Sequence, residues 1–558
     1  MDNKVIKLLN ALNDMIGIVD EYTLSQQTSE GIACLESYRE KKIEIQDCYL
    51  TCNSQQRNEL LQILEAEFHE EERTHNYLLS ILIKSCHDIF LIDKLIESIC
   101  RKQGDYYINL MIEYQIAYEL FANNYPKKEA YDLRRRLHSY NVEGFTKLLQ
   151  PPKTYRDISA RNHNRIVLIT DQLLGLHHAP TKILLEQCYS LQKNMGMEIL
   201  LFVCPVSLAT DHQITWFDQI KMNYFNELNG DYYISYRDGD ISVSPKESNG
   251  IFYIEYKDII LRGKQVVMDV ANLQAQKLLL QLIYEYNPLF VFNVNSINPL
   301  ADICNCFTTV VASSMAYGYP VSEGDILLYL DNLQAGANAA SVASILEGGR
   351  QIALNFRWTF QVDEPDFVHD RSHFQINEDE FVLMIVGNRL IDEITEEYVK
   401  VLEHILSVDS KVSILLIGTY PNYMDRFKAQ IFYGRVHAIG YQDQLATVIP
   451  LADLYLNPPR VGGGTSALYA LKAGVPVITL PDCDVAINVG REFTCINYEE
   501  MTQLIIKYKE DQEFYDLQRI LGLKLVHSLG DVTSAMEEML QSVKKIMMET
   551  EGKILHAD

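Results

Sequence analysis

Apolar residues recur at helical spacing through the first 150 residues of the chain. Leu60 and Leu64, for example, fall on one face of a helix, while acidic and basic residues fill the positions between such stripes. A Pro151-Pro152 pair then closes this stretch. The pattern predicts an all-helical domain over residues 1–155.

The pattern then changes to short apolar, β-branched runs separated by helical stretches. Residues 166–170 and 198–204 are runs of this kind, which are typical of strands buried on both faces. Further runs at 288–294 and 325–330 follow a helical stretch over 270–285. The β-α-β alternation predicts a parallel sheet with crossover helices.

One stretch of this region, residues 229–264, alternates polar and apolar residues instead. Asp238-Gly239 and Asn249-Gly250 supply turn signals within it, so the stretch predicts a β-hairpin or meander inserted in the α/β domain of residues 160–375. Asp238-Gly239-Asp240 imitates a D-x-D metal motif, but Asp-Gly between alternating strands favours a hairpin turn. We therefore expect no metal site here.

A second α/β unit is predicted over residues 376–558, with a helix at 534–550. Its five apolar runs lie at 381–387, 412–418, 435–440, 454–458 and 475–480. The predicted fold class is therefore α/β, with two Rossmann-like doubly wound domains preceded by an all-α domain. Ligands of such sheets bind at the carboxyl ends of the strands, so we expect a cleft between the two units.

Composition narrows the range of partners. The 558 residues are 47% hydrophobic and 22% charged, with a net charge of −26, so nucleic acid and anionic membrane surfaces are not expected partners. We find no signal-peptide pattern and no run of about 18 apolar residues. The 11 cysteines form no C-x-x-C pair, which favours free thiols in a reducing cytoplasm.

The most informative stretch reads ADLYLNPPRVGGGTSALYALKAGVPVITL. After a strand, Arg460 and the glycines of residues 462–464 lead to Thr465 and Ser466, which can cap a helix over 467–473. Glycines let a ligand approach the backbone, and the helix N-terminus attracts phosphate. The pattern predicts a diphosphate cradle that is neither a Walker A loop nor a dinucleotide fingerprint. A purely structural turn is the alternative.

The order of motifs here resembles the C-terminal half of two-domain nucleotide-sugar glycosyltransferases of the GT-B fold. VGNRL at 386–390, LLLIG at 414–418 and VHAIGY at 436–441 precede the glycine stretch. The resemblance implies that the glycine turn and the end of the GNRL strand bind the donor diphosphate. By position these residues are Arg389, Gly463, Gly464, Thr465 and Ser466; Asn388, Arg460 and Tyr469 are further donor-binding candidates.

The chain departs from this group in three places. Many members carry an acidic residue for the ribose hydroxyls where Tyr469 stands here, and the glutamate pair of retaining members is absent. Asp392 and Glu393 stand where the O-linked group has a lysine. The nucleotide base and the stereochemistry of transfer are therefore left open.

The first α/β unit offers a second set of candidates. ITDQLLGLHHAPTK places His177 and His178 in a loop after a strand that ends near Asp171. This loop is similar to the His-Pro-Thr region of O-linked N-acetylglucosamine transferases and of cytoplasmic bacterial protein N-glycosyltransferases, which also carry a leading helical domain. A histidine can act as a general base or bind substrate. We favour His178, with Asp171 as a lesser candidate base.

Asn295 and Ser296 follow the strand at 288–294 and are predicted at the rim of the cleft, where they can bind sugar or acceptor. An Asx turn explains them nearly as well.

The resemblance implies a metal-independent hexosyltransferase that uses a nucleotide sugar, a UDP-sugar in our interpretation, without a cofactor. The leading helical domain favours a protein acceptor and a cytoplasmic location. Three alternatives stay open: a non-catalytic GT-B-like partner subunit, a transferase acting on a glycan or lipid-linked acceptor, and a sugar-phosphate epimerase. A homo-oligomer or a complex with a partner subunit is compatible with each.

Overall fold

A computed structural model describes most of the chain. The described residues are 2–25, 29–68, 72–102, 104–123, 125, 127–176, 178–206, 216–217, 232–237, 240–245, 251–294, 297–315, 320–330, 351–419, 434–460, 462–481 and 483–554.

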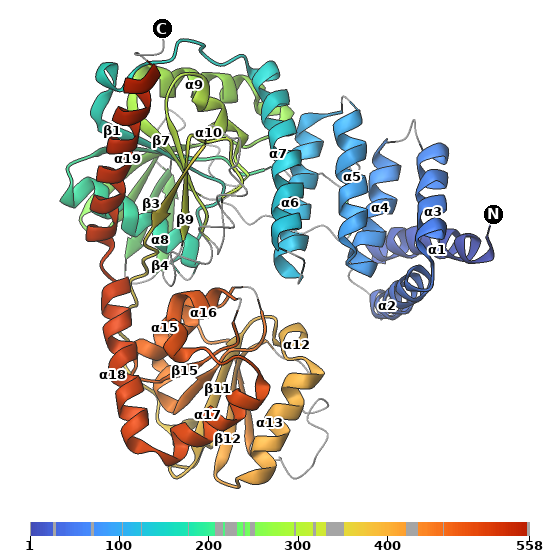
Figure 1. Ribbon diagram of the computed structural model, residues 1–558, viewed down its shortest axis with the longest axis vertical. Coiled ribbons are helices and arrows are strands. Elements are labelled where there is room, and N and C mark those ends of the chain that lie inside the picture. The colour runs from blue at the N-terminus through green and yellow to red at the C-terminus, as the bar shows by residue number, and fades with distance from the viewer. Residues whose placement is uncertain are drawn as a thin grey trace.

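The N-terminal region is helical in its described part, as predicted. The helices are α1 (Asn3–Ser25), α2 (Ser29–Leu50), α3 (Ser54–Glu67), α4 (Glu72–Cys86), α5 (Ile89–Arg101), α6 (Tyr106–Ala122) and α7 (Lys127–Leu149). Side-chain caps fix several of their starts: Asn53 and Gln56 form a capping box at α3, and Asp105 accepts from the first N–H groups of α6. The helices stack beside the α/β units, with α6 and α7 nearest to them (Figure 1).

The first α/β unit is built on a sheet of order β10-β9-β8-β7-β1-β2-β6-β5-β3-β4 in the described residues. Its parallel core contains β1 (Asn162–Thr170), β2 (Glu198–Val203), β7 (Pro288–Val294), β8 (Val310–Ser313), β9 (Ile326–Leu330) and β10 (Ile352–Phe356). Strands β8 and β10 are additions to the predicted set. One face of the sheet, with Val167 and Phe202, joins the apolar cluster that contains Leu137 and Phe145 of α7. The helical domain and this unit therefore share a core.

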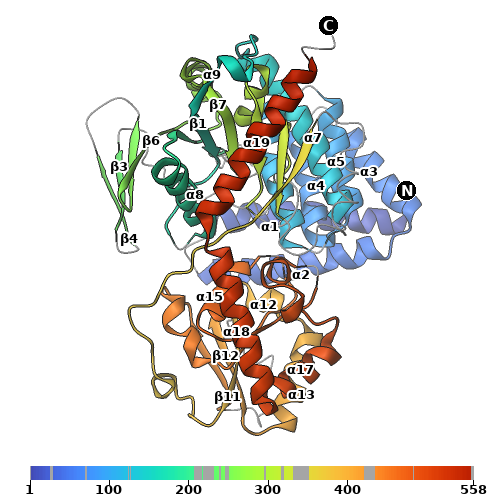
Figure 2. The same ribbon diagram turned by 60° about the vertical axis from the view of Figure 1, so that its left-hand side comes forward.

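The predicted insertion forms four strands: β3 (Tyr232–Arg237), β4 (Asp240–Pro245), β5 (Phe252–Tyr256) and β6 (Ile259–Gln265). Pairs β3–β4 and β5–β6 are antiparallel, whereas β3 runs parallel to β5, so the insertion is not a simple meander. Strand β6 pairs with β2 and extends the main sheet, while β3 and β4 project from it (Figure 2). Both predicted turns, at 238–239 and 249–250, lie outside the described residues.

The second α/β unit contains the five predicted strands. They are β11 (Phe381–Gly387), β12 (Val412–Gly418), β13 (Val436–Gly440), β14 (Leu454–Leu456) and β15 (Val477–Ile478), all parallel, in the order β13-β12-β11-β14-β15. The helices of this unit are α12 (Leu390–Glu393), α13 (Glu396–Val408), α15 (Gly464–Lys472), α16 (Asp484–Val489), α17 (Tyr498–Glu510) and α18 (Gln512–Leu529).

The last helix, α19 (Val532–Ile554), returns to the first unit. Ser190 and Asn194 of the first unit hydrogen-bond to Thr533 at 3.3 Å and 2.7 Å. Helix α18 follows the second unit and α19 follows the first, along one side of the molecule (Figure 1). We predicted this helix as the end of the second domain, and its packing corrects that assignment. The apolar face of α19 can be read from the sequence, but the neighbour that it covers cannot.

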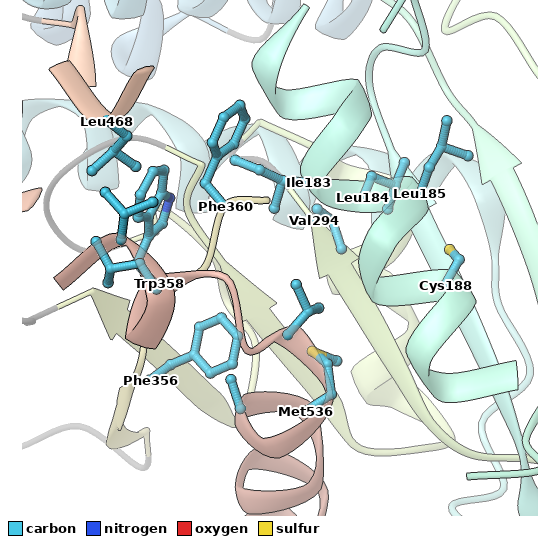
Figure 3. Close-up of a cluster of buried hydrophobic side chains, with 14 of the residues drawn as sticks. Ile183, Leu184, Leu185, Cys188, Val294, Phe356, Trp358, Phe360, Leu468 and Met536 are labelled. Atoms are coloured by element: carbon cyan, nitrogen blue, oxygen red, sulfur yellow. The ribbon is translucent and has the colours of Figure 1, made fainter. Parts of the chain in front are cut away.

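An aromatic segment fills the space where the two units meet. Trp358 and Phe360 stack with ring centroids 5.9 Å apart and planes 7° apart. In the same buried cluster, Trp358 lies toward Leu468 of α15 and Phe356 lies toward Met536 of α19 (Figure 3). Both units and the C-terminal helix therefore share apolar contacts at this junction.

Each sheet has a point where the strand order reverses. In the first sheet it lies between β1 and β7, and in the second between β11 and β14. Loops that leave the carboxyl ends of such a pair diverge and open a crevice, the usual ligand position in doubly wound sheets. Among the described site residues, Asp171 follows β1, Asn388 and Arg389 follow β11, and the glycine turn follows β14.

Candidate functional site

The glycine turn after β14 opens directly into α15. Gly462 and Gly463 have φ of +89° and +79°, a left-handed backbone that glycine adopts without strain. The Gly462 N–H donates to Asp484 Oδ2 at 2.6 Å, which anchors the turn to α16. Helix α15 begins at Gly464 with Gly463 as its N-cap. It starts three residues earlier than predicted, and neither Thr465 nor Ser466 caps it.

Ser466 is tied into the protein rather than presented to the cleft. The Arg460 guanidinium donates to the Tyr455 hydroxyl at 2.9 Å, which lies 2.8 Å from Ser466 Oγ. Ser466 in turn donates to the Gly463 carbonyl at 2.8 Å. This chain of hydrogen bonds stabilises the conformation of the glycine turn. The backbone N–H groups of the first turn of α15 and the half-buried Thr465 are left as the phosphate-binding candidates.

The Arg460 side chain is buried and stabilises the loop around the glycine turn through hydrogen bonds. It is only 4% exposed. It donates to Asn457 Oδ1 at 2.9 Å, to the Val386 carbonyl at 2.6 Å and to Glu393 Oε2 at 3.0 Å. Together with the bond to Tyr455, these contacts engage all three of its nitrogens. We predicted Arg460 as a phosphate ligand; its geometry is that of a scaffold for the glycine turn.

Glu393 links this buried arginine to the more exposed Arg389. Oε1 of Glu393 accepts from Arg389 Nε at 3.2 Å while Oε2 pairs with Arg460, and Glu393 itself is buried. Arg389 follows β11, its side chain is 36% exposed, and its Nη2 lies 3.9 Å from where a Cβ on Gly462 would stand. Arg389 therefore lies beside the glycine turn, and its role in binding the diphosphate stays a prediction. Asn388, next to it, is exposed.

Alanine at Gly463 is expected to destabilise the protein through two separable effects. A left-handed alanine costs about 1–2 kcal/mol of backbone strain, and its Cβ would stand 2.6 Å from the Arg460 guanidinium. Gly440 provides the matched control because its φ is +71° and no atom lies within 4 Å of its Cβ position. Urea unfolding should show a larger loss in the free energy of unfolding for Gly463→Ala than for Gly440→Ala. Equal losses would mean that the contact between the new Cβ and Arg460 adds no cost.

Tyr469 lies farther along α15, at the junction of the two units. Its hydroxyl donates to Asp363 Oδ2 at 3.3 Å, and the same carboxylate oxygen accepts from Lys182 of α8 (Ala179–Tyr189). The Lys182 side chain is 4% exposed, and its Nζ lies 5.2 Å from the centre of the Phe360 ring. Tyr469 thus takes part in a contact between the two units. The assignment of Tyr469 to donor binding stays a prediction.

His178 lies at the start of α8 in the first unit. Its Nδ1 is 2.9 Å from the Thr181 hydroxyl, and that hydroxyl oxygen also accepts from the Leu174 N–H at 2.8 Å. Burial lowers the pKa of His178 to about 4, so the imidazole is neutral at pH 7. The pKa is low because burial disfavours the charged form of the ring.

The remaining first-unit candidates divide into two groups. Asp171 follows β1 and is buried at 7% exposure, near Tyr114 of α6. His177, Asn295 and Ser296 lie outside the described residues. No group of three or more His, Cys, Asp or Glu side chains in the described part of the chain is arranged to hold a metal ion.

No protein-family model and no curated protein sequence matches the chain. Among solved structures, an O-GlcNAc transferase variant from Thermobaculum terrenum aligns with a TM-score of 0.52 at 14% identity, covering 98% of this chain and 99% of that one. The chain has the GT-B fold. The alignment extends over nearly the full length, so the likeness includes the helical region in front of the two GT-B units.

Two other solved structures align with about two thirds of the chain. The pneumococcal O-GlcNAc transferase GtfA aligns with a TM-score of 0.40 at 10% identity over 70% of this chain and 99% of that one. Trehalose-6-phosphate synthase OtsA aligns with a TM-score of 0.43 at 8% identity over 68% of this chain and 99% of that one. Both likenesses are too distant to support an argument about the site.

Sequence reasoning missed several residues that shape this site. Glu393 was noted only as a departure, although its spacing of four residues from Arg389 is an ion-pair signal. Asp363 and Lys182 gave no signal, because they are 181 residues apart in the sequence.

Proposed function

We propose that this GT-B protein is a glycosyltransferase that moves a sugar from a UDP-sugar to a protein side chain. The observation that carries the proposal is the start of α15 beside Arg389 at the point where the strand order of the second sheet reverses. Backbone N–H groups and a guanidinium there suit a diphosphate. The name of the Thermobaculum terrenum structure, an O-GlcNAc transferase, supports the choice of a protein acceptor.

The proposed role of the site in sugar transfer depends on where negative charge develops during the reaction. Negative charge grows on the diphosphate as the bond to the sugar breaks, and donors that already point at it lower the barrier. In our proposal the first-turn N–H groups of α15, Thr465 and Arg389 supply those donors. Metal independence belongs to the same proposal, since dipole and guanidinium can take the charge.

We assign His178 to substrate binding in the first unit. The Thr181 hydroxyl accepts from Leu174, so its own hydrogen can be donated to Nδ1 of His178. That arrangement leaves the proton on Nε2, which then acts as a hydrogen-bond donor. A pKa of about 4 also makes His178 a weak base at pH 7.

The free thiols support a cytoplasmic setting within the proposal. Ten cysteines in the described part of the chain form no disulfide, as expected in a reducing compartment. In the same described part, no helix is long and apolar enough to cross a bilayer.

Removing the phosphate ligands is the direct test. We expect Arg389→Ala to reduce transfer or donor hydrolysis by about 10²–10³-fold, the usual effect of losing one transition-state donor, and Thr465→Ala to reduce it less. Arg519→Ala is the matched control, because Arg519 is an exposed arginine of the same unit that pairs with Asp516. Mass spectrometry of a panel of nucleotide sugars with candidate acceptor proteins provides the readout. Unchanged transfer in both site variants would contradict the proposal.

A non-catalytic partner subunit is the second candidate, and one observation favours it. Tyr469 stands in the place of the ribose-binding acid and is engaged with Asp363 between the two units. Calorimetric titration with several nucleoside diphosphates separates the two candidates: binding supports the transferase, and absence of binding to all of them supports the partner subunit.

A further inference from the structure

The end of α6, in the helical domain, reaches the glycine turn of the second unit. The ζ carbon of Phe121 lies 3.7 Å from where a Cβ on Gly462 would stand. The centre of the Phe121 ring is 5.9 Å from the Arg389 guanidinium carbon, within the range of a cation–π contact. Phe121, which precedes Arg389 by nearly 270 positions in the sequence, therefore lies against the proposed phosphate site.

A buried carboxylate fixes this end of α6. Glu119 is 1% exposed and accepts from Asn123 at 2.8 Å and from the Tyr125 hydroxyl at 3.1 Å. His87 Nδ1 lies 2.8 Å from the same carboxylate, and Lys84 lies at 3.5 Å. Burial raises the pKa of Glu119, but the contacts with His87 and Lys84 outweigh it and hold the pKa below its usual value. The ionised Glu119 carboxylate and its contacts therefore stabilise the turn that carries Phe121.

The middle and the start of the same helix are fixed to the first unit. Glu113 of α6 pairs with His138 of α7, which pairs with Asp302 of α10 (Pro299–Ile303) at 2.6 Å. Near the start of α6, the Tyr107 hydroxyl donates to Gln276 of α9 (Leu273–Tyr286) at 2.8 Å. Helix α6 therefore connects the first unit to the proposed donor site on the second.

We propose that Phe121 is a positioning residue for the donor: its ring holds the Arg389 guanidinium against the glycine turn, so the helical domain forms one wall of the donor site. This inference rests on the proposed function. Arg389 is then held by both Glu393 and the ring, and Gly462 leaves room for the ring and the guanidinium. A guanidinium restrained in this way loses less side-chain entropy when it binds a phosphate.

The test compares UDP binding and donor KM in the full-length protein. We expect Phe121→Ala to weaken UDP binding and raise the donor KM by about two- to fivefold, the range of a partly exposed cation–π contact, with kcat nearly unchanged. Phe121→Tyr keeps the ring and should behave like the wild type. Phe90→Ala is the matched control, because Phe90 is a half-buried phenylalanine of the same domain with Lys94 5.5 Å from its ring centre.

The effect must also depend on Arg389. In an Arg389→Ala background, Phe121→Ala should add no further loss of UDP affinity, whereas a general structural defect would add its full loss. Wild-type binding of UDP combined with equal binding by Phe121→Ala would overturn this inference and leave the proposed function intact. A wild-type protein that binds no nucleoside diphosphate would overturn both. Unfolding curves of each variant identify any loss that comes from misfolding.

Discussion

Replacing His138 by glutamine is expected to lower the free energy of unfolding by about 3–5 kcal/mol, the usual result of breaking a buried ion pair from one side. His138 is fully buried, with Nδ1 2.7 Å from Glu113 and Nε2 2.6 Å from Asp302. Carboxylates only accept, so both ring nitrogens carry protons and the ring is an imidazolium. A neutral amide in its place would leave two buried carboxylates without a cation between them.

The second oxygens of these carboxylates are also occupied. Asn141 donates to Glu113 Oε2 at 2.7 Å, and Ser322 donates to Asp302 Oδ1 at 2.5 Å. All four carboxylate oxygens of Glu113 and Asp302 therefore have partners in the native protein, and little rearrangement is available to relieve a lost partner. The variant should therefore lose the docking of the helical domain on the first unit as well as stability.

The pH dependence of this effect has a definite sign. Burial lowers the pKa of His138, but Glu113 and Asp302 outweigh it and raise the pKa to about 10. A folded-state pKa above the unfolded value of about 6.5 gives stability that is complete below that value and is lost as pH rises through about 10.

Thermal unfolding from pH 6 to pH 10 measures this dependence. The difference in stability between the wild type and His138→Gln should shrink as pH rises above 7. His404→Gln, a change of an exposed histidine on α13, should show no such difference. A gap between wild type and His138→Gln that stays constant over this range would mean that His138 is not charged in the folded protein.

The sequence was sufficient to predict the helices and strands whose apolar residues follow a regular pattern. The predicted strands at 381–387 and 412–418 coincide with β11 and β12, because their apolar runs were long and bounded by glycine. Strands β8 and β10, of four and five residues, were missed, because the period of a short apolar run does not by itself distinguish a strand from other buried segments. The predicted helix boundary was wrong at the start of α15, because Gly464 was assigned to a loop.

The site shows a different limit. The glycine turn and Arg389 could be named from the sequence because each belongs to a local motif at one strand–helix connection; their role in binding phosphate stays a prediction. The role of Arg460 could not be read from the sequence, since its partners Val386 and Glu393 come from a separate strand and helix. Phe121 belongs to a different domain again, and no sequence period could place it beside Gly462.

Replacing Arg460 by methionine is expected to be as damaging as the change at His138, with a loss of about 3–5 kcal/mol in the free energy of unfolding. The side chain lengths are similar, so the main effect is the loss of charge and hydrogen bonds. Glu393 would keep only the half-exposed Arg389 as a partner, and Asn457 and Tyr455 would each lose a donor. The glycine turn would lose the support that orients it, so UDP binding should fall as well.

A pair of further variants identifies the cause. Arg460→Met combined with Glu393→Gln removes both charges and should be less destabilised than Arg460→Met alone, because no buried charge is then left unpaired. Arg460→Lys keeps the charge but cannot reach four partners with one ammonium group, so its stability should lie between those of the wild type and Arg460→Met. Urea unfolding followed by circular dichroism measures all three. If Arg460→Met unfolded at the same urea concentration as the wild type, the arginine could not be what holds the turn, and the support would have to come from Asp484, which accepts from the Gly462 N–H on the other side.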